Sequence, residues 1–133
     1  MMLAGSPVIW KSVIQKRTAA NNNESEVIAM EDVLREVKWL NIFLDDVGQS
    51  KFLTTPCEIL SDNQGGIAIS KGDGVSERTR HCAVEARVLQ EAVENEFVKK
   101  YVYVPTEKNI ADLLTKTLSG VTTKSFCLNL GLV

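Results

Sequence analysis

The chain has 133 residues, 44% of them hydrophobic, which is enough apolar material for one ordinary core and too little length for two domains. We therefore expect a single domain over residues 1–133. The formal net charge of −2 excludes bulk electrostatic attraction to nucleic acid, so phosphate binding would need a local basic patch. Every apolar run is shorter than the ~20 residues of a membrane span, and we expect no membrane contact.

The cysteines and the opening residues bear on the cellular compartment. Three cysteines at wide spacing, without a CxxC pair, argue against a disulfide framework and against a zinc knuckle. Reduced thiols suit an intracellular protein, either cytoplasmic or nuclear. The opening MMLAGSP is too short for a secretory signal. A signal that had already been removed would leave secretion open.

The first part of the chain predicts a strand followed by a long helix. Residues 7–15 are rich in β-branched and aromatic side chains, which favours a strand. Asn21, Asn22 and Asn23 then supply N-cap chemistry for a helix over residues 24–47. Steps of three and four residues mark the apolar stripe of this helix: Met30, Val33, Val37, Leu40, Phe43, Leu44 and Val47.

Two acids near the start of this helix differ in direction. At 100° per residue, Glu26 falls in the middle of the apolar stripe, whereas Glu24 falls almost opposite it. A first-turn acid that the helix dipole stabilises is the simpler interpretation of Glu26. That interpretation leaves the inward direction of Glu26 unexplained.

The next segment places an acid at the end of a strand. Residues 57–61 predict a short apolar strand, Asp62 follows, and residues 63–69 indicate a helix that opens directly after it. Asp62 suits either the N-cap of that helix or a metal site that cleaves phosphodiesters. Gly65 and Gly66 would let a ligand approach the backbone closely, but the pair alone does not make a phosphate loop.

A local basic cluster follows this helix. It comprises Lys71, Arg78, Arg80 and His81 and is the one stretch placed to contact phosphates. A solvated loop is the alternative interpretation of the cluster. His81 is the sole histidine, and it suits the start of a helix as well as it suits catalysis.

The last third of the chain alternates helices with a strand. A helix to about residue 94 precedes residues 97–104, the most strand-like run of the chain. Asn109 then caps a predicted helix over residues 110–118, and Asp112 lies in its first turn, where the dipole would favour an exposed acid. A helix or an extended segment closes the chain. The buried face of the helix that ends near residue 94 is marked by Val84, Val88, Leu89 and Ala92. The order of all these elements predicts an α/β fold with parallel crossovers.

Four ordered motifs cover nearly the whole chain. Residues 6–30, SPVIWKSVIQKRTAANNNESEVIAM, are similar to SPVSWSSKKQKTVALSSTEAEYMA, and SDNQGGI at residues 61–67 is similar to CDNQSAI. ERTRHCA at residues 77–83 is similar to ERTKHID, and VPTEKNIADLLTK at residues 104–116 to VPTxxxxADxLTK. Together these motifs resemble the carboxyl-terminal part of the RNase H domain of copia-type retrotransposon polyproteins.

The resemblance implies a metal-dependent endonuclease that cuts the RNA strand of an RNA–DNA hybrid. In that family, four carboxylates hold two divalent ions about 4 Å apart. Mg²⁺ or Mn²⁺ suits such oxygen ligands. By position, Glu26, Asp62 and Asp112 match the second, third and fourth acids, and the basic cluster would contact the hybrid.

The sequence also departs from the family. The first acid, on a strand that precedes residues 6–30 in the family, has no counterpart, and Ala83 and Glu85 replace an acid and a base. We therefore expect a domain without nuclease activity by itself. Because the absent strand is the centre of the family's sheet, we expect a truncated RNase H-like fold of three main strands, largely parallel, with flanking helices. One solution places residues 8–14 in the vacant central position.

The absence of the family's central strand also bears on the partners of the chain. An open sheet edge could instead be paired by a second copy of the chain or by a partner protein. Three functions stay open on this basis. They are a nuclease that another chain completes, a nucleic-acid-binding fragment, and a protein-interaction module such as a regulator or effector.

Overall fold

A computed structural model describes residues 1–52, 56–72, 80 and 82–132 of the chain. The chain divides into two compact units. The larger unit is Arg17–Val104, and the smaller unit combines Met1–Lys16 with Pro105–Val133. The expectation of a single domain over the whole chain stays a prediction.

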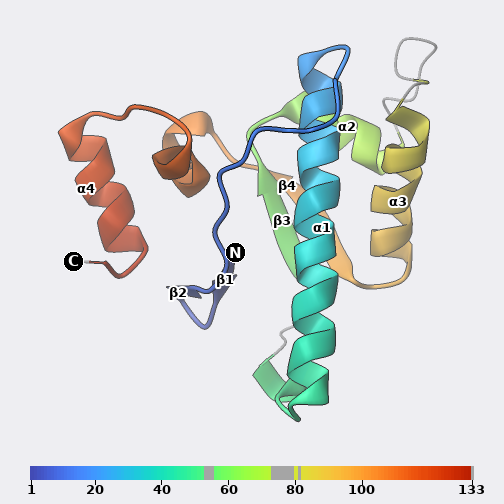
Figure 1. Ribbon diagram of the computed structural model, residues 1–133, viewed down its shortest axis with the longest axis horizontal. Coiled ribbons are helices and arrows are strands. Elements are labelled where there is room, and N and C mark those ends of the chain that lie inside the picture. Colours follow the sequence, from blue (N-terminus) through green and yellow to red (C-terminus); the bar gives the residue numbers. More distant parts are fainter. Residues whose placement is uncertain (53–55, 73–79, 81, 133) are drawn as a thin grey trace. The chain divides into compact units, whose positions relative to one another are not determined.

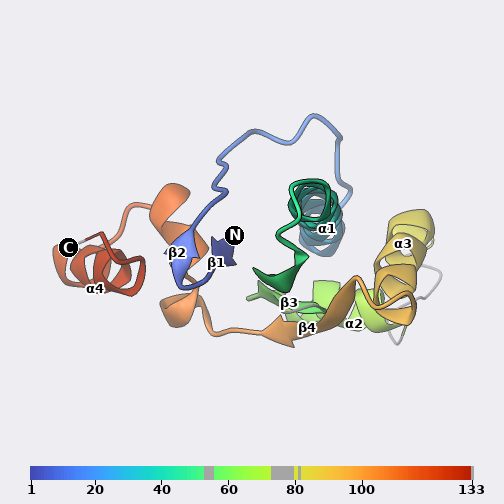
Figure 2. The same ribbon diagram turned by 90° about the horizontal axis from the view of Figure 1, so that it is seen from below.

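The larger unit is built from helices around one parallel pair of strands (Figures 1 and 2). β3 and β4 are parallel, and α2 and α3 lie in the connection between them. α1 packs against both of these helices. The predicted alternation of helices with a parallel pair is therefore confirmed here. In chain order the elements are α1 (Asn22–Asp46), the 3-10 helix η1 (Ser50–Phe52), β3 (Cys57–Ser61), α2 (Gln64–Lys71), α3 (Ala83–Glu94) and β4 (Val98–Tyr103).

The core of the larger unit lies between the helices and one face of β3 and β4. Along β3, Ile59 and Ser61 are buried whereas Leu60 is exposed, the alternation of a strand that is covered on one face. The Tyr101 hydroxyl donates to the Leu89 carbonyl oxygen at 2.9 Å, and burial raises the pKa of this phenol. The buried cluster comprises Val27, Met30, Leu34, Ile59, Ile67, Ile69, Cys82, Ala86, Leu89, Ala92, Val98 and Tyr101.

α1 begins at the predicted asparagine cap. The Asn21 side chain accepts the Glu24 backbone N–H at 3.0 Å, and the Glu24 carboxylate accepts the Ala20 N–H. The first bond satisfies one of the N–H groups that a helix start leaves without partners, and the second ties the residue before the cap to the first turn. The predicted stripe needs correction, because Val33 and Phe43 are 42% and 46% exposed. The stripe that meets the core is instead Val27, Met30, Leu34, Val37 and Leu44.

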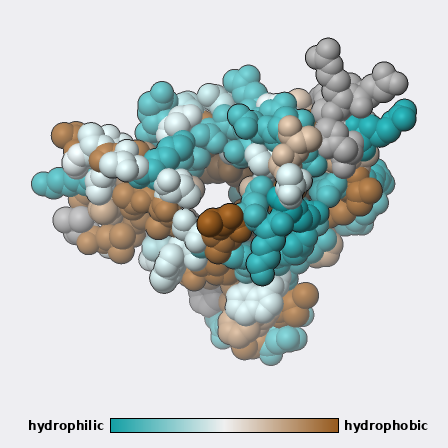
Figure 3. Space-filling model, turned by 45° about the horizontal axis from the view of Figure 1, so that its top comes forward, coloured by the Kyte–Doolittle hydropathy of each residue, from teal (hydrophilic) through white to brown (hydrophobic). Residues whose placement is uncertain are grey.

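The carboxyl-terminal half of α1 presents apolar side chains to solvent. Trp39 and Phe43 stack with their ring centroids 5.4 Å apart, and Trp39 is 54% exposed. The Lys38 ammonium lies 5.1 Å from the centroid of the Phe97 ring. Figure 3 shows one face of the chain, on which hydrophobic residues reach the surface among hydrophilic ones. Exposed apolar residues of this kind are ordinary on protein surfaces.

α3 buries a narrower face than the sequence predicted. Ala86, Leu89 and Ala92 are buried, and Val88 is partly buried. Val84 is 75% exposed, which contradicts its predicted place on the buried face. Val84 is five residues from Leu89, which places it about 140° away around the helix.

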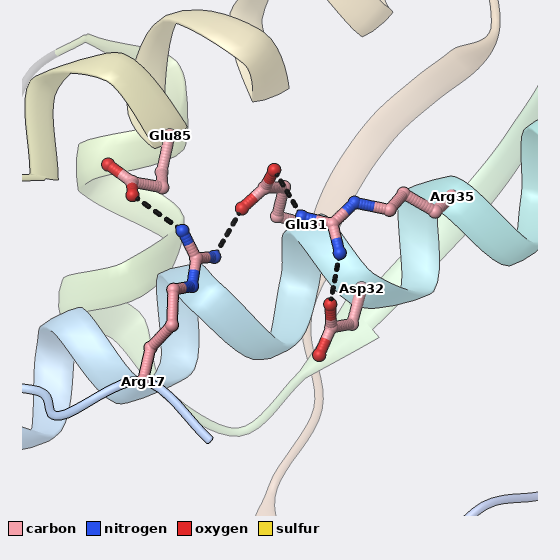
Figure 4. A network of polar contacts seen from close by, with 5 residues as sticks. All are labelled: Arg17, Glu31, Asp32, Arg35 and Glu85. Carbon is pink, nitrogen blue, oxygen red and sulfur yellow. Dashed lines mark hydrogen bonds and ion pairs between the residues drawn. The ribbon is translucent and has the colours of Figure 1, made fainter. Parts of the chain in front are cut away.

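An ion-pair network joins the segment before α1 to α1 and α3 (Figure 4). The Arg17 guanidinium lies 2.6 Å from the Glu31 carboxylate and 2.9 Å from that of Glu85. Arg35 lies 2.7 Å from Glu31 and 2.8 Å from Asp32. The hydrogen bond to Glu31 raises the pKa of Arg17. Burial acts to raise the pKa of Glu31, but the hydrogen bonds from Arg35 and Arg17 outweigh burial and lower it.

The predicted strand over residues 7–15 is not formed. Residues 8–15 lie outside every helix and strand, and Trp10, Val13 and Ile14 are 69%, 64% and 94% exposed. A high β-propensity means that a side chain fits a pleated, half-buried surface, and nothing half-buries these three side chains. The described residues therefore hold no third main strand, and the expected place of residues 8–14 in a central sheet is wrong.

The smaller unit is made of short elements. β1 (Met2–Leu3) pairs with β2 (Ser6–Pro7) in antiparallel fashion, and the 3-10 helices η3 (Thr106–Lys108) and η4 (Ile110–Leu114) precede α4 (Gly120–Asn129). Of the two forms considered for the end of the chain, the helix is found. The predicted helix over residues 110–118 is reduced to η4. Ser119, near its predicted end, instead caps α4 by accepting the Thr122 N–H at 3.2 Å.

Candidate carboxylate site

Asp62 lies between the last residue of β3 and the cap of α2. Asn63 is that cap, because its side chain accepts the Gly66 backbone N–H at 2.8 Å. The N-cap interpretation of Asp62 is therefore wrong. Asp62 is half-buried and lies just beyond the carboxyl end of a parallel strand. Open α/β sheets commonly bind their ligands at this position.

Glu26 reaches the same end of α2 from α1. A methyl group on Gly66 would lie 3.3 Å from the Glu26 Cβ and 3.8 Å from the Oδ1 of Asn63. Glu26 is half-buried, in agreement with its predicted inward direction. The two candidate acids of the larger unit, Glu26 and Asp62, therefore belong to the same end of α2. Asp62 stands directly before the cap, and Glu26 packs against the third residue of α2.

The two glycines of α2 accommodate side chains of α1. A methyl group on Gly65 would lie 2.5 to 2.7 Å from the carboxamide atoms of Asn23, which is an overlap. At Gly66 the neighbours are the Glu26 Cβ and the Met30 Sδ, at 3.3 and 3.6 Å. The sequence predicted that a ligand could approach the backbone at Gly65 and Gly66. In the structure, side chains of α1 occupy that position.

Asp112 lies in the smaller unit, within η4. Asn109 caps this 3-10 helix as predicted, with its side chain accepting the Ala111 N–H at 3.3 Å. Asp112 is only 6% exposed, and its Oδ2 lies 2.8 Å from the Lys116 Nζ. The expectation of an exposed acid that only the helix dipole stabilises is therefore wrong. A buried carboxylate needs a paired charge, and Lys116 supplies one from four residues away.

The carboxylates can be compared with the needs of a divalent ion. Within either unit, the part of the chain that the structure describes brings no three His, Cys, Asp or Glu side chains together as a metal site would. Mg²⁺ often binds through one or two carboxylates and keeps its remaining waters. Glu26 and Asp62 are two candidate carboxylates at one end of α2, which is the number that such a site uses. By themselves they do not fit a two-ion site of four carboxylates.

The predicted basic cluster is only partly described. Lys71 and Arg80 are both exposed, whereas Arg78 and His81 lie outside the described residues. Lys71 is the last residue of α2, and Gly72 ends that helix with a positive φ of 89°. At 1.5 Å per residue, Lys71 is about 10 Å along the helix axis from the end that carries the acids. The exposed lysine and the two carboxylates thus mark opposite ends of α2.

The chain is similar to proteins of plant transposons. It is 32% identical over 117 residues to the retrovirus-related Pol polyprotein from transposon TNT 1-94 of Nicotiana tabacum. This match covers 86% of the chain and 8% of that polyprotein. Its homologues are copia-type retrotransposon Pol polyproteins. Those from transposons RE2 and RE1 of Arabidopsis thaliana are each 27% identical over 98% and 97% of the chain, respectively, and 9% of each polyprotein. The chain thus spans less than a tenth of the Pol polyproteins that it matches. No protein-family model and no solved structure matches it.

The Pol polyprotein homologues support a retrotransposon-derived region, as the motifs predicted. Sequence reasoning missed two residues that shape the candidate site. Asn63 stands three residues before Gly66, which is the spacing of an N-cap, and the adjacent Asp62 had the same claim to that role. Lys116 stands four residues after Asp112, a spacing that brings side chains together on a helix surface.

The cysteines and the apolar content of the helices bear on the predicted environment of the chain. Cys57, Cys82 and Cys127 are all free thiols, in agreement with the argument against a disulfide framework. Among the described residues, no helix combines the length and the apolar content that a membrane crossing needs. An intracellular location, cytoplasmic or nuclear, stays a prediction.

Proposed function

We propose that the chain is an RNase H-like part of a retrotransposon Pol polyprotein that holds a divalent ion weakly through Glu26 and Asp62 and does not cut RNA by itself. The observation that carries this proposal is that both acids belong to the same end of α2, with the Glu26 Cβ beside Gly66 and Asp62 directly before the Asn63 cap. The four ordered motifs support the RNase H part of the proposal, and the similarity to Pol polyproteins supports its retrotransposon part.

Each acid has a separate role in the proposed site. Asp62 offers its oxygens from a fixed position, because β3 pairs with β4 before it and Asn63 anchors α2 after it. Glu26 brings a second carboxylate from α1. A bound divalent ion would polarise phosphate oxygens and make its water a better nucleophile. Asp112 belongs to the smaller unit, where it is paired with Lys116.

The lack of activity follows from the number of ligands. In-line cleavage with two ions, as the resemblance implies, uses four carboxylates. The described residues of the larger unit contribute two at this position. We therefore expect cleavage of an RNA–DNA hybrid only when another chain completes the site, with Mg²⁺ or Mn²⁺ as the ions.

Two assays test the proposal together. Isothermal titration should show Mn²⁺ binding that Asp62→Asn and Glu26→Gln abolish and that Asp46→Asn, an exposed acid at the far end of α1, leaves unchanged. A labelled hybrid should stay intact with the chain alone in Mg²⁺ or Mn²⁺. Binding that survives both substitutions would overturn the site. Cleavage that Asp62→Asn abolishes would overturn the expected inactivity.

Contact with nucleic acid is a further part of the same proposal. Lys71 and Arg80 are exposed, and with Arg78 and His81 they form the local basic cluster of the sequence. Hybrid binding should weaken as salt rises, because each neutralised phosphate releases counterions. Replacing Lys71 and Arg80 with alanine together should lower both the affinity and its dependence on salt. Binding that ignores salt and both substitutions would contradict this role.

Self-association is a second candidate function. β3 and β4 form a sheet of only two strands, so each has one edge without a partner strand among the described residues. Leu60 is 60% exposed on the face of β3 turned away from the core. Open edges and exposed apolar residues favour strand addition, here by a second copy of the chain. Light scattering should then show a dimer at high concentration that Leu60→Lys weakens. A monomer at every concentration would exclude this function.

A further inference from the structure

The last turns of α1 carry an exposed apolar face. In Figure 1 this part of the helix extends beyond β3, β4 and α3. Phe43 lies nine residues after the buried Leu34, which places it about 180° around the helix from the core. Trp39 stacks on Phe43 with an angle of 10° between the ring planes, and Ile42 beside them is 63% exposed. Single exposed apolar residues are ordinary, but a contiguous group of them marks an interaction site.

One charged residue stands at each end of this apolar face. Arg35 lies one turn before Trp39, and Asp46 lies one turn after Ile42. The steps of four, three and four residues keep all four side chains on one face of the helix. The Arg35 side chain is 60% exposed although it pairs with two acids of its own helix, and its guanidinium has five N–H donors to share.

Asp46 is also unfavourably placed with respect to its own helix. It is the last residue of α1, where the helix dipole disfavours an acid. The last turn of α1, all of it within the described residues, contains no basic side chain that would offset this effect. A cation from outside the helix would therefore stabilise this end of α1.

We infer that this face of α1 is the interface of a homodimer, in which α1 of a second copy packs against it in antiparallel orientation. When Trp39 of one copy lies beside Ile42 of the other, Arg35 of one copy comes beside Asp46 of the other. A two-fold axis makes each of these contacts twice. Parallel packing would instead bring each charge beside its own copy, and like charges across an interface repel. The charges of this face thus complement an antiparallel second copy.

The size of the face indicates a weak dimer. Trp39 and Phe43, each about half exposed, present roughly 200 Å² of side-chain surface, and Ile42 and Val47 extend it. A standard interface buries ~800 Å² on each partner, so these residues would form only its apolar centre. A rigid tryptophan is typical of such a centre. The face lies at the other end of α1 from Glu26, and the inference rests neither on the proposed ion site nor on the edges of β3 and β4.

Charge reversal tests the antiparallel pairing, with association of the whole chain measured by analytical ultracentrifugation. The wild type should dimerise at high concentration. Arg35→Asp and Asp46→Arg each place like charges at both ends of the interface, so either variant alone should dimerise about tenfold more weakly. An equimolar mixture of the two variants restores opposite charges at both ends and should dimerise about as tightly as the wild type. Asp45→Arg is the matched control, because it reverses the same charge about 100° away around the helix and should keep the wild-type affinity.

Three results would overturn the inference, provided that circular dichroism shows each variant to be folded. The first is a wild type that stays monomeric at every concentration. The second is a mixture that associates no more tightly than its two components. The third is a dimer that Leu60→Lys weakens and Asp46→Arg does not, since that dimer would form through the sheet edge. If Arg35→Asp does not fold, Ile42→Glu replaces it. Ile42→Glu should weaken the dimer at least tenfold, and an unchanged dimer would overturn the inference as well.

Discussion

The two units hold their acids by different means. In the larger unit, Asp62 and Glu26 take their positions from a strand pair, a capped helix and α1, which share one buried core. In the smaller unit, Asp112 lies in a 3-10 helix of five residues and is held by Asn109 and Lys116, both within four residues of it. Packing between distant segments thus fixes the first pair, and local bonds fix Asp112. The larger unit should respond to core substitutions, whereas Asp112 should respond to its sequence neighbours.

The largest expected effect comes from the core of the larger unit. Leu34 is 1% exposed in the middle of α1, and Leu34→Ala should lower the free energy of unfolding by about 2–5 kcal/mol. Urea titration followed by circular dichroism measures this loss. Val84→Ala is the matched control, because Val84 is 75% exposed in the same unit and its truncation should change stability by less than about 0.5 kcal/mol. Equal effects would mean that the buried cluster does not hold α1 and, with it, Glu26.

A smaller effect distinguishes the cap of α2 from the neighbouring acid. Asn63→Ala removes the acceptor of the Gly66 N–H and should cost about 1 kcal/mol of unfolding free energy. Asp62→Asn keeps the shape of the side chain and should cost less than half as much, while it abolishes Mn²⁺ binding. The same urea titrations measure both. A larger cost for Asp62→Asn than for Asn63→Ala would return the cap to Asp62 and weaken the case for a carboxylate site.

Local signals explain which elements the sequence could predict. α1 was predicted from its asparagine cap and its apolar spacing, and β4 from its β-branched run. Each of these signals depends only on a few neighbouring residues. The strand expected over residues 7–15 failed because a strand also needs a neighbour and a covering layer, which its own residues do not encode. Val33 was misplaced for a related reason. Periodicity marks every apolar residue of a helix face, and packing decides which of them meets the core.

The features of the candidate site likewise divide into those that a short stretch of sequence predicts and those that it does not. The direction of Glu26 followed from helix geometry alone, because its azimuth depends only on its own helix. Its contact with Gly66 could not be predicted, since that contact joins residues of two helices 40 positions apart in the chain. The burial of Asp112 could not be predicted, because the sequence indicated a longer helix with Asp112 in its exposed first turn, whereas the residue lies in a five-residue 3-10 helix and pairs with Lys116.

The ion pair of the smaller unit gives the next prediction. Lys116→Gln removes the charge 2.8 Å from the buried Asp112 carboxylate and should lower the unfolding free energy by about 1 kcal/mol. Asp112→Asn in the Lys116→Gln background should recover most of that loss, because no unpaired charge then stays buried. Lys124→Gln, an exposed lysine of α4, is the control. If the double variant is as unstable as Lys116→Gln, a local ion pair is not what holds Asp112.

The smallest effect concerns the network of Figure 4 and depends on pH. Arg17 and Arg35 lower the pKa of Glu31 below its unfolded value near 4.5, so this acid stabilises the folded state above that pH and loses its contribution as pH falls through the folded pKa. Arg17→Gln removes one partner. It should therefore lower the unfolding free energy at pH 7 by at most about 1 kcal/mol, because Arg17 is solvent-exposed. The difference from wild type should shrink toward pH 3 and in high salt. Arg87→Gln is the control, since Arg87 pairs only within α3 among the contacts described. A difference that stays constant from pH 7 to pH 3 would show that Arg17 acts through packing between α1 and α3, the same kind of long-range contact that positions Glu26.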